Sequence, residues 1–144
     1  MTVDTSTLAA RSREELLRRN EVFERFFKAE APRLAEACRE MSRRFLAGGR
    51  LLAFGNGSAA TDAQHVSVEF VHPVIVGKRA LPALDLGPEF EARLPVILQP
   101  EDMVMGFAFP GRDEAVERTL RMAQDRGALT FALAGEAGDR KSVV

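Results

Sequence analysis

The residues best suited to chemistry lie in one segment, where a glycine-rich turn leads into a helical stretch. Gly55-Asn56-Gly57-Ser58 stands between a short apolar run and the helix predicted for residues 59–71. Backbone N–H groups at a helix start point outward and favour an anion, and glycines let the backbone approach a phosphate closely. Asn56, Gly57 and Ser58 are therefore candidate phosphate or substrate ligands. The same pattern also fits a plain strand-to-helix turn with Ser58 as the N-cap.

The predicted helix also carries two polar side chains four residues apart, His65 and Glu69, which share one face. Such a pair can bind a divalent metal or act as acid and base. Asp62 precedes His65 by three residues and could orient its ring. His72 extends the same face, but it precedes Pro73, which biases it out of helical geometry. An exposed polar helix face without a ligand is the alternative for all of these residues.

The glycine turn has a second interpretation. Gly55-x-Gly57-x-x-Ala60 fits the dinucleotide-binding fingerprint with a small third residue. That fingerprint needs an acid about 20 residues further on, at the end of the next strand. The nearest candidate, Asp85, comes later than this spacing requires, which argues against a dehydrogenase.

The elements that must position these residues follow from the apolar pattern. Strands are predicted at 51–54, 81–86, 103–107 and 128–134, with helices at 59–71 and 113–126. Strands that alternate with helices indicate an α/β fold with a parallel sheet. The strand at 51–54 is apolar throughout and should be central. Residues 87–101 contain three prolines and are predicted to be an irregular connection with a possible short strand or turn.

A charge-rich helical segment, 1–48, is expected to precede the α/β domain, 49–144. A capping-box spacing at Ser12 predicts the first helix start, and Pro32 predicts the start of a second helix. The pair is amphipathic, with apolar residues Leu16, Phe23, Phe26, Phe27, Leu34, Met41, Phe45 and Leu46. An exposed apolar surface of this size usually marks an assembly interface, so a homo-oligomer, a dimer or a tetramer, is expected.

Composition narrows the function classes. The chain has 144 residues and a net charge of −1, from 20 basic and 21 acidic side chains, which argues against a general nucleic-acid-binding surface. No apolar run is long enough to span a membrane, and no signal peptide is apparent at the N-terminus. The single cysteine, Cys38, excludes an internal disulfide and a cysteine-rich zinc site. A cytoplasmic protein is expected.

Several motifs together resemble the sugar isomerase (SIS) family, within it the phosphoheptose isomerase branch. The residues that carry the resemblance are Gly55-Asn56-Gly57-Ser58, Asp62-Ala63-Gln64-His65, Glu69 and Arg79-Ala80-Leu81-Pro82-Ala83-Leu84. The resemblance implies a flavodoxin-like three-layer parallel sheet, a homotetramer, and interconversion of ketose and aldose phosphates by proton transfer. It further implies that Ser58 holds phosphate, with Asn56, Gly57 and Asp62 at the substrate. His65 would be a zinc ligand, and Glu69 both a zinc ligand and the catalytic base.

The chain also departs from the family pattern. The family has a second phosphate loop, rich in serine and threonine, where this chain reads Gly106-Phe107-Ala108-Phe109-Pro110-Gly111-Arg112-Asp113. Arg112 could bind phosphate there or face solvent. The Asn-Asp pair that follows the second strand in the family is replaced by a shorter connection from Leu86. The family's last helix, which supplies a Gln and a His, has no counterpart before Val144.

These departures predict an incomplete active site, weak or absent zinc binding, and very low isomerase activity. Three functions remain open from the sequence. The chain could be an active isomerase that another chain completes, or a regulatory protein that binds a phosphosugar or nucleotide. It could also be a scaffold that holds a partner protein through its helical segment.

Overall fold

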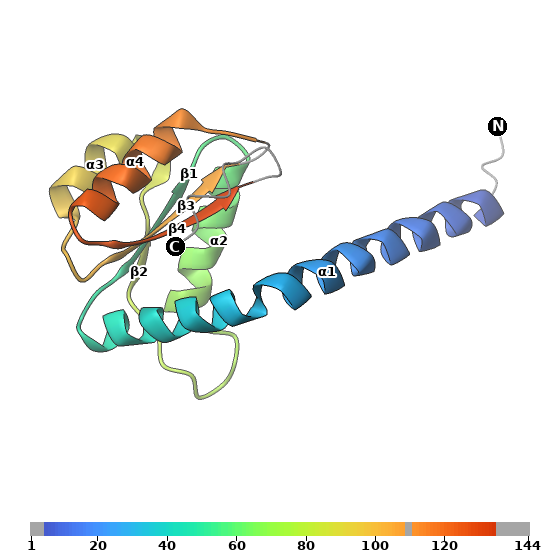
Figure 1. Cartoon of the computed structure of the whole chain (residues 1–144), viewed down its shortest axis with the longest axis horizontal. Helices are drawn as coiled ribbons and strands as arrows, with labels where there is room; N and C mark the ends of the chain where they lie inside the picture. Colours follow the sequence, from blue (N-terminus) through green and yellow to red (C-terminus); the bar gives the residue numbers. More distant parts are fainter. Residues whose placement is uncertain (1–4, 109–110, 135–144) are drawn as a thin grey trace. The chain divides into compact units, whose positions relative to one another are not determined.

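A parallel sheet forms the centre of the fold. The computed structural model describes residues 5–108 and 111–134, and its contacts group the chain into two units, Met1–Arg39 and Glu40–Val144. The sheet has four strands in the order β2-β1-β3-β4, with every neighbouring pair parallel (Figure 1). The strands are β1 (Leu51–Gly55), β2 (Ala83–Asp85), β3 (Met103–Ala108) and β4 (Leu129–Ala134). The predicted α/β parallel fold and the interior position of β1 are confirmed.

Helices cover both faces of the sheet, which gives the predicted three layers. Helix α2 (Ala59–Val71) lies on one face, and α3 (Phe90–Ile97) and α4 (Glu114–Asp125) lie together on the other (Figure 1). The sequence prediction for α2 had the same bounds. Each of these three helices follows one strand and leads to the next, which is the connection that parallel pairing requires.

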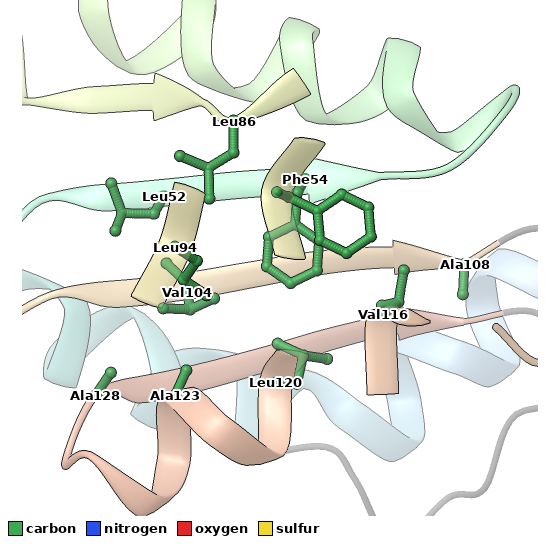
Figure 2. Close-up of a cluster of buried hydrophobic side chains, with 11 residues drawn as sticks. Leu52, Phe54, Leu86, Leu94, Val104, Ala108, Val116, Leu120, Ala123 and Ala128 are labelled. Carbon is green, nitrogen blue, oxygen red and sulfur yellow. The ribbon is translucent and has the colours of Figure 1, made fainter. Parts of the chain in front are cut away.

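Alternation of side chains along β1 builds two separate cores. Leu52 and Phe54 join the cluster beneath α3 and α4 (Figure 2). Phe54 stacks there on Phe90, with ring centroids 4.5 Å apart. Ala53 belongs to the smaller cluster under α2, which also includes Phe107. Successive residues of a strand point to opposite faces, so a strand between two helical layers must be apolar at every position.

The connection between β2 and β3 differs from the prediction. Instead of an irregular segment, it forms a 3₁₀ turn (Gly87–Glu89) that leads directly into α3. Pro88 lies in the first turn, where its missing N–H would have no helical partner in any case. Phe90 and Leu94 are four residues apart, and both are buried against the sheet. Their burial stabilises a short helix despite Pro95 near its end.

The expected N-terminal helical pair is instead one helix, α1 (Thr5–Leu46), with Pro32 inside it. The prediction of a helix start at Ser12 was likewise wrong. Pro32 removes one backbone hydrogen bond, but alanine, glutamate, leucine and arginine surround it, and these residues favour helix. None of the helices within 5–108 and 111–134 is long and apolar enough to cross a bilayer.

The last turn of α1, within the second unit, is attached to the amino edge of the sheet. Arg44 Nη1 donates to the carbonyl oxygens of Pro100, at 2.5 Å, and Gly127, at 3.2 Å. Phe45 stacks on Phe70 with ring centroids 5.6 Å apart. These contacts fix the point at which the chain turns into β1.

An ion pair ties the starts of β1 and β3 together. The Arg50 side chain donates to both carboxylate oxygens of the buried Asp102, at 3.1 and 2.6 Å. The backbone N–H groups of Arg50 and Gln99 add bonds of 2.9 and 3.0 Å. Burial acts to raise the pKa of Asp102, but the hydrogen bonds from Arg50 and Gln99 outweigh it and leave that pKa below its usual value. The charged carboxylate is therefore a stabilising part of the fold.

We expect Asp102→Asn to lower the free energy of unfolding by about 2 to 4 kcal/mol at pH 7, because it leaves Arg50 without its buried partner. Because the folded-state pKa of Asp102 is depressed, its contribution is present above about pH 4 and is lost as the pH falls further. The difference between the two proteins should therefore narrow in acid. Denaturant unfolding at pH 7 and pH 3 measures it.

Glu101→Gln is the matched control, because Glu101 is the exposed neighbour of Asp102. This control should change stability by less than about 0.5 kcal/mol. Equal stability of Asp102→Asn and the control at pH 7 would contradict the role given to the ion pair.

Candidate functional site

The order of the strands points to one edge of the sheet as the ligand site. From β1 the chain crosses to β2 on one side, whereas from β3 it crosses to β4 on the other. In open parallel sheets, ligands bind in the crevice outside the carboxyl ends of two such strands. In this chain the two segments at that position are the turn 56–58, which enters α2, and the segment 111–113, which enters α4. We refer to these residues as the switch-point crevice.

The turn that enters α2 is fixed by close backbone approach. A Cβ on Gly55 would lie 2.8 Å from the carbonyl oxygen of Ala59 and 3.0 Å from that of Phe107. Gly57 has a φ of +54°, and its Cα faces open space. A glycine is therefore needed at 55 for space and at 57 for conformation.

Ser58 occupies the N-cap position of α2, but its side chain makes no capping hydrogen bond and is exposed. The plain N-cap interpretation of this serine is therefore not observed. The first helical N–H groups, of Ala59, Ala60 and Thr61, bond to carbonyl oxygens of the turn at 3.0, 3.3 and 3.3 Å. What the turn presents to a ligand is the Ser58 hydroxyl and the backbone around Gly57.

Asn56 reaches across the crevice to α4. Its Nδ2 donates to Asp113 Oδ2 at 2.9 Å. Asp113 is the N-cap of α4, and its Oδ1 accepts from the N–H groups of Ala115 and Val116 at 3.0 and 3.1 Å. The sequence predicted Asn56 as a ligand-binding residue but missed this contact. The only available signal was the acidic residue at the start of the helix predicted from 113, a position that favours N-capping.

His65 and Glu69 are brought together as their spacing predicted, with His65 Nε2 3.3 Å from Glu69 Oε1. Their side chains are 72% and 44% exposed. Ala63 and Ser67 are buried on the other face of α2. Within one chain, the described residues therefore place the pair on an open helix surface. Glu69, and not Asp62, is the partner of His65 among those residues.

His65 and Glu69 are the two side chains here that could serve as metal ligands. Within residues 5–108 and 111–134, no three His, Cys, Asp or Glu side chains lie close enough to hold an ion together. His72 forms the C-cap of α2 and is exposed. An imidazole nitrogen and a carboxylate oxygen are both ligands that zinc takes, but a zinc site needs at least three protein ligands.

The remaining predicted groups near α4 are engaged or lie outside the described residues. Arg112 forms an ion pair with Glu117, with a nitrogen–oxygen distance of 2.7 Å. Phe109 and Pro110, which the family resemblance compares with the second phosphate loop, lie outside the described residues. A cavity of about 410 Å³ lies between β2 and α3, lined mainly by Leu84, Leu86, Val96 and Ile97. It contains none of the predicted site residues.

The fold and the crevice together define a class: an α/β protein with a parallel sheet and a ligand site at the carboxyl ends of adjacent strands. No protein-family model matches the chain. It is 36% identical over 114 residues to a phosphoheptose isomerase from Crocosphaera subtropica. The matched region covers 68% of this chain and 58% of that protein. A phosphoheptose isomerase from Solidesulfovibrio magneticus is 33% identical over 130 residues, covering 79% of this chain and 64% of the relative.

Solved structures agree with this fold. A phosphoheptose isomerase from Neisseria gonorrhoeae has a TM-score of 0.77 and 21% identity, over 91% of this chain and 77% of that one. One from Francisella tularensis has a TM-score of 0.67 and 22% identity, over 88% and 79%. The chain is therefore similar in sequence to proteins named phosphoheptose isomerase and shares the fold of the solved ones. It spans less than two thirds of the length of the two relatives named above.

The two glycines of the turn should respond differently to substitution. We expect Gly55→Ala to lower the free energy of unfolding by about 2 to 3 kcal/mol, because the added Cβ overlaps backbone that cannot move aside. Gly57→Ala should cost about 1 kcal/mol, since only the left-handed conformation opposes it. Gly57→Asn should cost less, because asparagine tolerates that conformation. Denaturant unfolding measures all three, and a larger loss for Gly57→Ala than for Gly55→Ala would contradict this account.

Proposed function

We propose that the chain binds a sugar phosphate along the carboxyl edge of the sheet and α2, and that Glu69 is the base of a ketose–aldose isomerisation. The observation that carries the proposal is the pairing of His65 and Glu69 on the helix that the glycine turn begins. The similarity to proteins named phosphoheptose isomerase supports the same reaction. We further propose a cytoplasmic location, which suits a chain whose one cysteine is exposed.

The proposed chemistry divides between the two ends of α2. Ser58, with the backbone at Gly57, would hold the phosphate near the start of the helix, and Asn56 and Asp62 would contact the sugar. Isomerisation moves a proton between neighbouring carbons, which needs a positioned base. The Glu69 carboxylate would take this proton from one carbon and return it to the next.

Zinc is part of this proposal, with His65 Nε2 and a Glu69 oxygen as its ligands from this chain. When bound, zinc would polarise the sugar carbonyl. The two donors of one chain are too few for a stable site, so we propose that binding in an isolated chain is weak.

A second copy of the chain would complete the site. Most of the apolar side chains of α1 are exposed among the described residues; Phe26, for example, is 48% exposed, and none of the 42 residues of α1 is buried. An uncovered apolar face of this kind marks an assembly surface. We propose a homo-oligomer, a tetramer or a dimer, in which a neighbouring copy also covers the open pair His65 and Glu69.

A non-catalytic role is the second candidate. The openness of His65 and Glu69, together with the apolar face of α1, would also suit a regulatory protein or a scaffold that binds a partner protein. In that case sugar phosphate would bind without being converted, or would not bind. Measuring proton exchange separates this candidate from the first.

We expect the protein to catalyse slow exchange of a carbon-bound proton of sedoheptulose 7-phosphate in D₂O, because exchange needs the base but not the full set of catalytic groups. Glu69→Gln should slow the exchange by about 10² to 10⁴-fold, as loss of a general base does. Proton NMR measures the loss of the substrate signal.

Glu101→Gln removes an exposed carboxylate elsewhere and serves as the control for this experiment. It should exchange at the wild-type rate. An equal exchange rate in Glu69→Gln would remove Glu69 from the proposed role, and the absence of exchange in the wild type would favour the regulatory or scaffold candidate.

Replacing an apolar residue of α1 should weaken the assembly. We expect light scattering to give an oligomer for the wild type and a smaller species for Phe26→Glu, because a charge in an apolar interface is costly. Arg25→Gln makes the same change in net charge at an exposed basic residue of the same turn and should keep the wild-type mass. A monomeric wild type at micromolar concentration would contradict the proposed assembly.

A further inference from the structure

The switch-point crevice contains a carboxylate where an anionic ligand would otherwise find hydrogen-bond donors. The start of α4 borders the crevice, and a free helix start attracts anions through its unbonded N–H groups. In this chain the N–H groups of Ala115 and Val116 both bond to Asp113 Oδ1. The α4 side of the crevice therefore already holds an anion that belongs to the protein.

The same carboxylate also fixes the side chain that faces it. Asn56 Nδ2, the donor that the turn could offer, bonds to Asp113 Oδ2 at 2.9 Å. Asp113 thus engages donors from both sides of the crevice. A phosphate placed between them would have to displace these bonds and approach a like charge.

The nearest cation in the sequence is engaged by another carboxylate. Arg112 stands next to Asp113 but pairs with Glu117, which also accepts a bond from Arg121. The α4 side therefore presents a phosphate with the Asp113 carboxylate where free helix-start donors would otherwise stand.

We propose that Asp113 is a specificity-determining residue that sets the orientation of the ligand. The phosphate is excluded from the α4 side and binds at Gly57 and Ser58, while the uncharged, hydroxyl-bearing part of the sugar faces Asp113. A carboxylate with three hydrogen bonds keeps room to accept another from a hydroxyl. This inference rests on the proposed function, because it assumes that the crevice receives a sugar phosphate.

The test compares the dissociation constants of inorganic phosphate and sedoheptulose 7-phosphate, by calorimetry at low ionic strength. Removing the carboxylate should tighten inorganic phosphate about tenfold, the effect of one charge on a dianion roughly 6 Å away in a water-like medium. In the variants, the preference for sugar phosphate over inorganic phosphate should fall by a similar factor. The reason is that the carboxylate of Asp113 is no longer present to accept a hydrogen bond from a sugar hydroxyl. Added salt should reduce the increase in phosphate affinity that the variants show, because salt screens charge.

Two variants at this position keep the helix cap while removing the charge. Asp113→Asn and Asp113→Ser both place a favoured N-cap residue at the start of α4, so the fold should be preserved. Their thermal unfolding without ligand checks this. Asp125→Asn removes an equal charge at the far end of α4 and should leave both dissociation constants unchanged.

The outcomes separate this inference from the proposed function. If the wild type binds the sugar phosphate and both Asp113 variants leave the two dissociation constants unchanged, the role of Asp113 is overturned and the proposed function stands. If phosphate tightens in the variants but no protein binds the sugar phosphate, the exclusion of phosphate stands, while the orientation of the sugar and the proposed function fail. If no protein binds either compound, both are overturned.

Discussion

The burial of β1 on both faces is the constraint on which the rest of the structure depends. All five residues of this strand are buried, and it pairs with β2 on one side and β3 on the other. Because its side chains feed two cores, helices must cover both faces of the sheet. The strand must then end where α2 and β3 come close to its backbone, and only a glycine fits there. The turn that follows is the one that carries the candidate ligand groups.

Local pattern was enough to predict much of this fold. The apolar run at 51–54 and the helical spacing of 59–71 each specify one element, and adjacent strands and helices fix the parallel sheet. Proline was the main source of error. Local rules predict a helix start at Pro32 and irregular structure at the prolines of 87–101. Both predictions are wrong, because a sequence does not show how far tertiary burial or strong flanking helix formers offset one lost hydrogen bond. The pair Arg50–Asp102 joins residues 52 positions apart, so no local spacing could predict it.

The candidate site shows the same division. The pair His65–Glu69 follows from the helical period, since residues four apart share a face. Its exposure does not, because that depends on which face of α2 packs against the sheet. The bond between Asn56 and Asp113 is a contact between two loops that only the sheet brings together. It changes the meaning of the crevice: a turn that looks suited to phosphate faces a helix start that already holds a carboxylate.

The central claim is that a sugar phosphate binds along the carboxyl edge of the sheet and the exposed face of α2. The most direct test is to follow backbone amide signals by NMR while titrating sedoheptulose 7-phosphate into the ¹⁵N-labelled protein. The account predicts that the largest shifts fall on Gly57 and Ser58, with smaller ones at His65 and Glu69. Shifts confined to the cavity between β2 and α3, around Leu86 and Val96, would contradict it.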